Sequence, residues 1–113
     1  MARTGRAAPA RDERTIAGRN PLGGATVVNL SPAVAQELGV DPFAAPGGVL
    51  VIRLEGGSLA ETVGVRPGDL IREVNGRPIK ATADLSAALA TPAAAWRITL
   101  QRGDQQITGQ FRL

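Results

Sequence analysis

The spacing of apolar and polar residues predicts a chain of short strands. Residues 49–54 are nearly continuously apolar, with one arginine, which is typical of a strand buried on both faces. In the last part of the chain apolar and polar residues alternate on both sides of Gly103, which predicts two antiparallel strands joined by a turn. Shorter β-rich segments at 25–30 and 69–74 predict two further strands.

Three segments carry helix signals. In residues 31–39 a Ser-Pro pair opens a helix as N-cap and first helical residue, and a glycine ends it. Ser58 and Glu61 match a capping box, which predicts a helix of little more than one turn. Residues 82–90 predict a third helix. The sum is a small, mainly β (α+β) domain with five or six strands, two longer helices and one short helix.

Two further turns and an adhesion-like tripeptide fit the same plan. Asn75 and Gly76 are a strong signal for a two-residue hairpin, and Pro78 marks the returning segment as an edge. Residues 102–104 read Arg-Gly-Asp, the letters of an integrin-type motif. Because they lie between two alternating segments, a hairpin turn is the simpler interpretation.

The composition excludes several kinds of chemistry. The 113 residues suffice for one domain, whose core must be aliphatic because 43% of the chain is apolar and only 3% aromatic. Neither cysteine nor histidine is present, which removes disulfides, thiolate nucleophiles and the base of a Ser-His-Asp triad. The acidic residues show no metal-ligand spacing. We therefore expect no catalysis by this chain, no metal and no cofactor.

The basic character of the chain is confined to its start. Residues 1–20 carry five arginines against two acidic residues, whereas the other 93 residues carry eight basic and eight acidic side chains. No basic face is visible in the body, so we expect no nucleic-acid partner. No apolar run is long enough to span a bilayer, so we expect no membrane insertion. Residues 1–18 are predicted to be a flexible basic linker without a signal peptide, followed by one domain over 19–113.

Two adjacent glycines, Gly23 and Gly24, precede the segment at 25–30. A phosphate-binding loop requires a helix after the glycines, and a P-loop also requires a lysine; this sequence has neither there. A tight turn or bulge is the simplest explanation. If 25–30 lies at the edge of the sheet, its free N–H and C=O groups can instead pair with an extended peptide, and the turn can direct N–H groups at a terminal carboxylate.

At this point the sequence resembles a known family. Residues 47–79 resemble the central block of bacterial PDZ domains, with a buried strand, a Gly-Ser start to a short helix, Pro-Gly-Asp and Val-Asn-Gly. The resemblance extends over 19–113 and implies a PDZ-like, partly open barrel or sandwich of five to six strands in the permuted bacterial order. Residues 18–40 resemble the start of the second PDZ domain of periplasmic serine proteases of the HtrA/DegP (Do-like) type.

The resemblance implies a peptide-binding site. The carboxylate-binding loop of the family falls on residues 22–25, the peptide-pairing strand on 25–30, and the facing side chains on the helix at 82–90. Apolar members of the set would line the pocket for the peptide's terminal side chain, and the arginine would help to hold its carboxylate. The implied site residues are Arg19, Leu22, Gly23, Gly24, Ala25, Thr26, Val27, Thr82, Ser86 and Leu89.

One position departs from the family pattern, because Gly23 stands where an apolar side chain is usual. Either the pocket is shallow and recognition of C-termini weak, or the loop moves to fit its ligand. The resemblance implies a non-catalytic, periplasmic module that binds apolar C-terminal or unfolded segments for substrate recognition and regulation, with a serine endopeptidase domain upstream. The alternative is a module that docks on other domains or subunits of the same protease.

Overall fold

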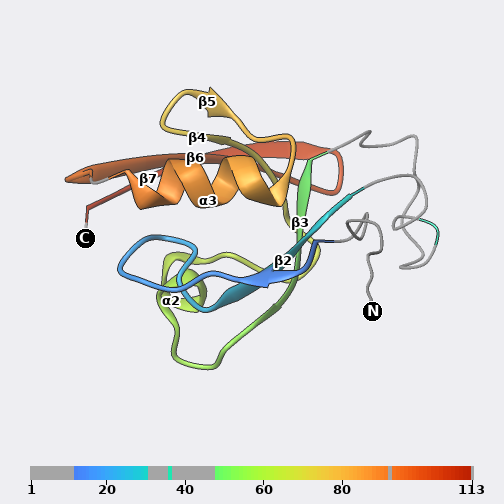
Figure 1. Ribbon diagram of the computed structural model, residues 1–113, viewed down its shortest axis with the longest axis horizontal. Coiled ribbons are helices and arrows are strands. Elements are labelled where there is room, and N and C mark those ends of the chain that lie inside the picture. The colour runs from blue at the N-terminus through green and yellow to red at the C-terminus, as the bar shows by residue number, and fades with distance from the viewer. Residues whose placement is uncertain (1–11, 31–35, 37–47, 92, 113) are drawn as a thin grey trace, which may run out of the picture.

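The computed structural model describes residues 12–30, 36, 48–91 and 93–112 (Figure 1). Within them lie two helices, α2 (Leu59–Val63) and α3 (Thr82–Ala90). The strands are β1 (Arg14–Thr15), β2 (Ala25–Asn29), β3 (Val49–Leu54), β4 (Leu70–Val74), β5 (Arg77–Pro78), β6 (Ala95–Arg102) and β7 (Gln105–Arg112).

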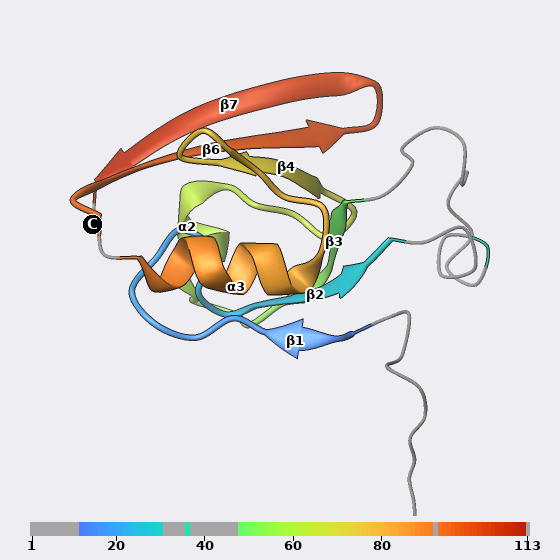
Figure 2. The ribbon, with the colours of Figure 1, turned by 45° about the horizontal axis from the view of Figure 1, so that its top comes forward.

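The strands form one antiparallel sheet in the order β1-β2-β3-β4-β6-β7, with β5 paired to β4. The sheet curves, so that the β6–β7 hairpin lies on one side of α3 and the β1–β2 pair on the other (Figure 2). Helix α3 contacts both β2 and β4 and thereby closes the open side of the curve. The predicted mainly β (α+β) fold class is confirmed.

The elements with a clear period agree with the sequence prediction. Strand β3 and helix α3 have the predicted bounds, and β2 ends one residue earlier than predicted. The predicted helix at 31–39 lies outside the described residues apart from Gln36, which is helical. The prediction of five to six strands was too low, because seven strands lie in the described ranges. The strand that the sequence missed is β1, in the stretch assigned to a flexible linker.

The predicted turns are present. Asn75 and Gly76 have φ values of +49° and +83°, as a type I′ hairpin between β4 and β5 requires. Gly103, at φ +64°, turns the chain between β6 and β7, where Arg102 pairs with Gln105. The Arg-Gly-Asp letters are therefore a hairpin turn, as predicted.

The core is aliphatic and lies on both faces of β2 and β3. Because side chains alternate along a strand, Val27 points to the main core under α3 and Val28 to a smaller cluster on the opposite face. Both valines are fully buried, and the larger cluster also contains Trp96 and Leu85. Leu85 is fully buried and anchors α3 in this cluster.

A buried carboxylate joins the turn before β4 to the end of β6. Asp69 is 1% exposed and accepts the Arg66 N–H at 2.8 Å. The Nε and Nη2 atoms of Arg102 also donate to its two carboxylate oxygens, each at 2.8 Å. Arg102 donates further to the Gly64 carbonyl at 2.9 Å. This bidentate pair links segments 33 residues apart, and local sequence patterns did not predict it.

Candidate functional site

The edge of β2 that faces α3 is not free in this chain. Strand β1 lies antiparallel along it, with Arg14 opposite Val27 and Thr15 opposite Thr26 (Figure 2). The expectation that 25–30 presents an unpaired edge is therefore wrong for the part of β2 beside β1. Residues 12–16, called the segment below, lie where the sequence analysis placed an extended peptide, in the groove between β2 and α3.

Ile16 anchors this segment. Its N–H donates to the Ala25 carbonyl and its carbonyl accepts the Gly24 N–H, both at 2.8 Å. Its side chain is 7% exposed and belongs to the main core cluster. Full burial of an aliphatic side chain of this size contributes about 1.5–3 kcal/mol. Residues 12–16 therefore pack as part of the domain, although the sequence analysis placed the domain boundary after residue 18.

Polar side chains connect the segment to α3. The Thr82 hydroxyl donates to Asp12 Oδ2 at 2.7 Å, and Arg14 Nη1 donates to Ser86 Oγ at 3.1 Å. Arg14 also forms an ion pair with Asp12 at 3.0 Å, with both side chains more than a third exposed. Thr82 and Ser86 lie one turn apart on the same face of α3, so alternate residues of the segment meet successive turns of the helix.

The other side of the segment faces β2 and β3. The Thr15 and Thr26 hydroxyl oxygens lie 3.0 Å apart across the strand pair. Glu13 forms an exposed ion pair of 3.1 Å with Arg53 on β3. Side chains therefore alternate between two surfaces from residue 12 to residue 16, as expected of a strand with partners on both sides.

The charge of Asp12 favours docking of the segment. Hydrogen bonds from Arg14 and Thr82, helped by the positive charge of Arg14, hold the pKa of Asp12 below its ordinary value, although partial burial opposes this. A lowered pKa means that the docked state favours the ionised form. This contribution is complete above about pH 4 and is lost as the pH falls through the lowered pKa.

We predict that acid weakens the docking of residues 12–16 through Asp12. The Ile16 methyl resonances should move away from their docked shifts as the pH is lowered from 6 to 3, and the Asp12→Asn chain should show a smaller change. Equal pH dependence in the two chains would contradict this role of Asp12.

The loop predicted to bind a terminal carboxylate is closed on itself. The Gly23 N–H donates to the Asn20 carbonyl and the Ala25 N–H donates to the Leu22 carbonyl, each at 3.0 Å. The Gly24 N–H alone among these three is directed at the segment in the groove, where it meets the Ile16 carbonyl. A carboxylate arriving in place of Ile16 would therefore find one of these three N–H donors, whereas an anion-binding nest needs several in succession.

The departure at Gly23 has a steric cause. A Cβ built on Gly23 would lie 2.5 Å from the Gly18 carbonyl oxygen, which is backbone and cannot move aside. Buried Asn20 holds this turn, because its side chain donates to the Ala17 carbonyl at 3.1 Å and accepts the Leu22 N–H at 3.0 Å. A bulky residue at position 23 is incompatible with the closed turn.

The structure separates the predicted site residues into three groups. Thr82, Ser86 and the half-buried Leu89 face the groove, and the last two line a cavity of about 230 Å³ beside β1. Arg19 is exposed and makes no recorded hydrogen bond or ion pair in the described part of the chain. The third group lies in the closed loop and in β2. These residues shape the groove through their backbone groups or through buried side chains. They are Leu22, Gly23, Gly24, Ala25, Thr26 and Val27.

Sequence reasoning missed the residues that fill the groove. Asp12, Arg14 and Ile16 form contacts to α3 and the core, and all three precede the predicted domain. The sequence held only a weak strand signal there. Residues 12, 14 and 16 are spaced as on one face of a strand, and residues 15 and 16 are the β-branched pair Thr-Ile. Two residues of strand give no measurable period.

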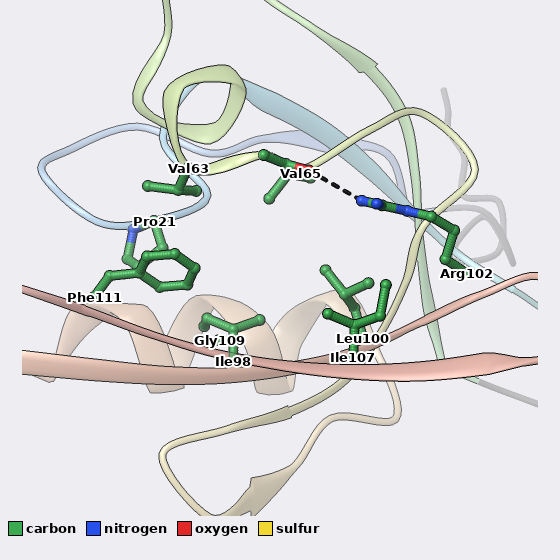
Figure 3. A pocket seen from close by; sticks show the side chains of 10 residues that line it. Pro21, Val63, Val65, Ile98, Leu100, Arg102, Ile107, Gly109 and Phe111 are labelled. Atoms are coloured by element: carbon green, nitrogen blue, oxygen red, sulfur yellow. Dashed lines mark hydrogen bonds between the residues drawn. The ribbon is translucent and has the colours of Figure 1, made fainter.

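A second cavity, of about 210 Å³, lies between the end of α2 and the β6–β7 hairpin (Figure 3). Its lining is mostly aliphatic and includes Phe111 and Ile107 of β7, but no residue of α3. The guanidinium of Arg102 is at its rim and is already bound to Asp69. This cavity therefore offers apolar contact and few unoccupied polar groups to orient a ligand.

The described ranges contain neither a metal-type cluster nor a membrane-spanning helix. No group of three or more acidic, cysteine or histidine side chains there is placed to hold a metal ion. No helix in the same ranges combines the length and apolar character needed to cross a bilayer.

Comparison with known proteins points to one family. A model described as "PDZ domain" matches residues 51–102. Two relatives, each named as a probable periplasmic DegP-like serine endoprotease, come from Chlamydia pneumoniae (39% identical) and Chlamydia trachomatis serovar D (36%). Each match covers 66 residues, which is 58% of this chain but 13% of the relative. The chain thus spans a small part of these relatives.

Two solved structures share the fold. One is the HtrA3 PDZ domain bound to a phage-derived ligand, FGRWV, with a TM-score of 0.64 and 22% identity over 78% of this chain and 84% of that chain. The other is the HtrA-type protease AlgW with a decapeptide, with a TM-score of 0.62 and 22% identity over 79% of this chain and 27% of that chain. The chain therefore has the predicted PDZ-like fold, and part of its sequence is similar to PDZ domains and to DegP-like serine endoproteases.

Proposed function

We propose that this domain is a non-catalytic peptide-binding module of a periplasmic serine endopeptidase of the HtrA/DegP type. It takes extended apolar segments of substrates as an added strand on β2, under α3, and so serves substrate recognition and regulation. We further propose that it is the second PDZ domain of its parent, that the protease domain lies upstream, and that residues 12–16 belong to the domain.

One observation carries the proposal: the β2–α3 groove already holds an extended segment in antiparallel register, with an aliphatic side chain in the core. Main-chain pairing of this kind supplies affinity in strand addition, and the pocket for a side chain supplies preference. The groove therefore has the width, the backbone partners and the apolar slot that an external peptide requires.

The ligand named for the HtrA3 PDZ domain supports the same site. Its sequence, FGRWV, places an arginine two residues before a β-branched aliphatic residue. Arg14 and Ile16 have the same spacing in the segment that occupies the groove. The likeness supports a groove that accepts this side-chain pattern.

The closed loop indicates which kind of peptide end the site tolerates. Because the loop directs one N–H of the three into the groove, a terminal carboxylate gains little over an ordinary carbonyl. We therefore propose that internal segments bind about as well as C-terminal ones. The micromolar affinity typical of a weak interaction, roughly −8 kcal/mol, is the upper limit expected for either.

A paired titration tests this function. The heptapeptide with the sequence of residues 10–16, ending in isoleucine, is added to the labelled chain once as the free acid and once as the amide. We predict saturable shifts at the amides of β2 and α3 and dissociation constants that agree within about threefold, since the expected difference is less than 1 kcal/mol. Shifts confined to other surfaces would contradict the proposed site, and a tenfold preference for the acid would contradict the closed loop.

A second candidate function is docking on another subunit of the protease. It is favoured by β7, whose strand partner among the described residues is β6 alone and which contributes Ile107 and Phe111 to the apolar cavity of Figure 3. A Phe111→Arg change in the parent protein should then lower its oligomeric state in light scattering. Unchanged assembly would remove this candidate.

A further inference from the structure

We propose that residues 12–16 are a built-in ligand of the β2–α3 groove, which external peptides must displace. Their chemistry defines the ligand class: an extended segment with a β-branched aliphatic residue, preceded two positions earlier by a basic residue. The inference rests on the proposed peptide-binding function and adds a competitor and a specificity to that site.

Apart from Ile16, the contacts that hold residues 12–16 in the groove are weak enough for the segment to be displaced. Asp12, Glu13 and Arg14 form ion pairs whose side chains are 36–63% exposed, and Asp12 also accepts a hydrogen bond from the buried Thr82 hydroxyl. Exposed pairs of this kind add little stability. Ile16 is the single deeply buried anchor of the segment, so its release exposes one aliphatic side chain and one slot.

The same contacts indicate what replaces it. The slot that holds Ile16 is lined by core aliphatic residues, which selects an apolar side chain of similar size. Two residues earlier, the Ser86 oxygen accepts from a guanidinium, which selects a basic donor at that position. A β-branched residue is favoured at the anchor because it suits a strand paired along its length.

The tether makes self-occupancy strong even though the contacts are modest. Eight residues, 17–24, connect Ile16 to β2. A short linker gives an effective concentration on the order of millimolar. Against an intrinsic dissociation constant of about 10 µM, the groove is self-occupied at about 100 to 1, and an external peptide binds about 10²-fold more weakly than the groove allows.

A reversible lock tests the proposal on one folded molecule. Thr15 and Thr26 face each other with their oxygens 3.0 Å apart, and the chain contains no other thiol, so Thr15→Cys with Thr26→Cys can close one disulfide across β1 and β2. The probe is the amidated heptapeptide with the sequence of residues 10–16. We expect saturable shifts at β2 and α3 in the reduced form, and at least a tenfold loss of affinity in the oxidised form.

A second pair of variants measures the competition. Ile16→Ser removes the anchor and should raise the affinity for the heptapeptide by 10- to 100-fold. Ile52→Ser makes the same chemical change at a half-buried residue of β3 that packs in the other apolar cluster, and it should leave the affinity unchanged. In the peptide, Arg14→Glu and Ile16→Ser should each weaken binding at least tenfold.

The outcomes separate the two proposals. Equal binding by the oxidised and reduced forms would overturn the built-in ligand, because the peptide would then bind without displacing β1. Equal affinity of the Arg14→Glu peptide would overturn the assigned ligand class. If neither the reduced form nor a folded Ile16→Ser chain binds any peptide, the peptide-binding function itself fails.

Discussion

Replacing Arg102 with methionine is expected to lower the free energy of unfolding by about 3–5 kcal/mol, because removal of one partner leaves a buried charge uncompensated. Asp69 is 1% exposed, and Arg102 supplies two of its hydrogen bonds. Methionine keeps the apolar stem of the side chain and removes the donors. Urea unfolding measures the loss, and the melting temperature should fall by more than about 10 °C.

Arg97→Met is the matched control, since it lies on the same strand. Its ion pair with Glu73 spans 3.8 Å between side chains that are 52% and 40% exposed. A pair of this kind is worth about 0–1 kcal/mol. Equal losses in the two variants would show that burial of Asp69 does not decide the contribution of its partner.

The second large effect is expected for Gly24→Ala, which should cost about 3 kcal/mol or more. Gly24 has φ +89°, and a Cβ there would lie 2.3 Å from the Ser58 Cβ. The left-handed conformation alone costs a side-chain-bearing residue about 1–2 kcal/mol, and forced overpacking adds about 1–3 kcal/mol. Chemical denaturation measures the sum, and the shift of β1 resonances reports whether the Gly24 bond to Ile16 survives.

Two glycines on the adjacent turn separate the causes. Gly57 has φ +78° with no atom within 4 Å of a built Cβ, so Gly57→Ala should show the conformational cost alone. Gly56 has neither constraint, and Gly56→Ala should lie within about 0.5 kcal/mol of wild type. Adding Ser58→Gly to Gly24→Ala should recover the steric part, because glycine replaces a serine N-cap at a cost of a few tenths of a kcal/mol. A Gly24→Ala loss no larger than that of Gly57→Ala would contradict the contact with Ser58.

Local patterns predicted most of the fold because the spacing of apolar residues within an element indicates whether it is a strand or a helix. The nearly continuous apolar run at β3 and the helical segment at α3 were located to the residue. Asn75 and Gly76 specify their hairpin through backbone conformations that few other residue pairs adopt. Strand β1 escaped prediction because its two residues are too short for a period, and its pairing partner lies on the far side of a tight turn.

The sequence predicted which elements form the groove, but it did not predict that residues 12–16 lie in it. The glycine loop, β2 and the facing side chains Thr82 and Ser86 came from the resemblance to PDZ domains. The contact between Thr82 and Asp12 joins residues 70 positions apart, and no local pattern records such a pair. The meaning of Gly23 also required the folded turn, because the obstacle to a side chain there is a backbone oxygen of Gly18.

By itself, the sequence determined an aliphatic antiparallel domain without histidine or cysteine, and its turn residues placed that domain close to one family. Those properties depend on residue type and short-range spacing. The tertiary structure alone decided that residues 12–16 fill the edge of β2 and that the loop donates one N–H of three to the groove. Both depend on which backbone groups meet across the fold. Every residue except proline has the same N–H and C=O groups, so residue types do not show which of them are already paired.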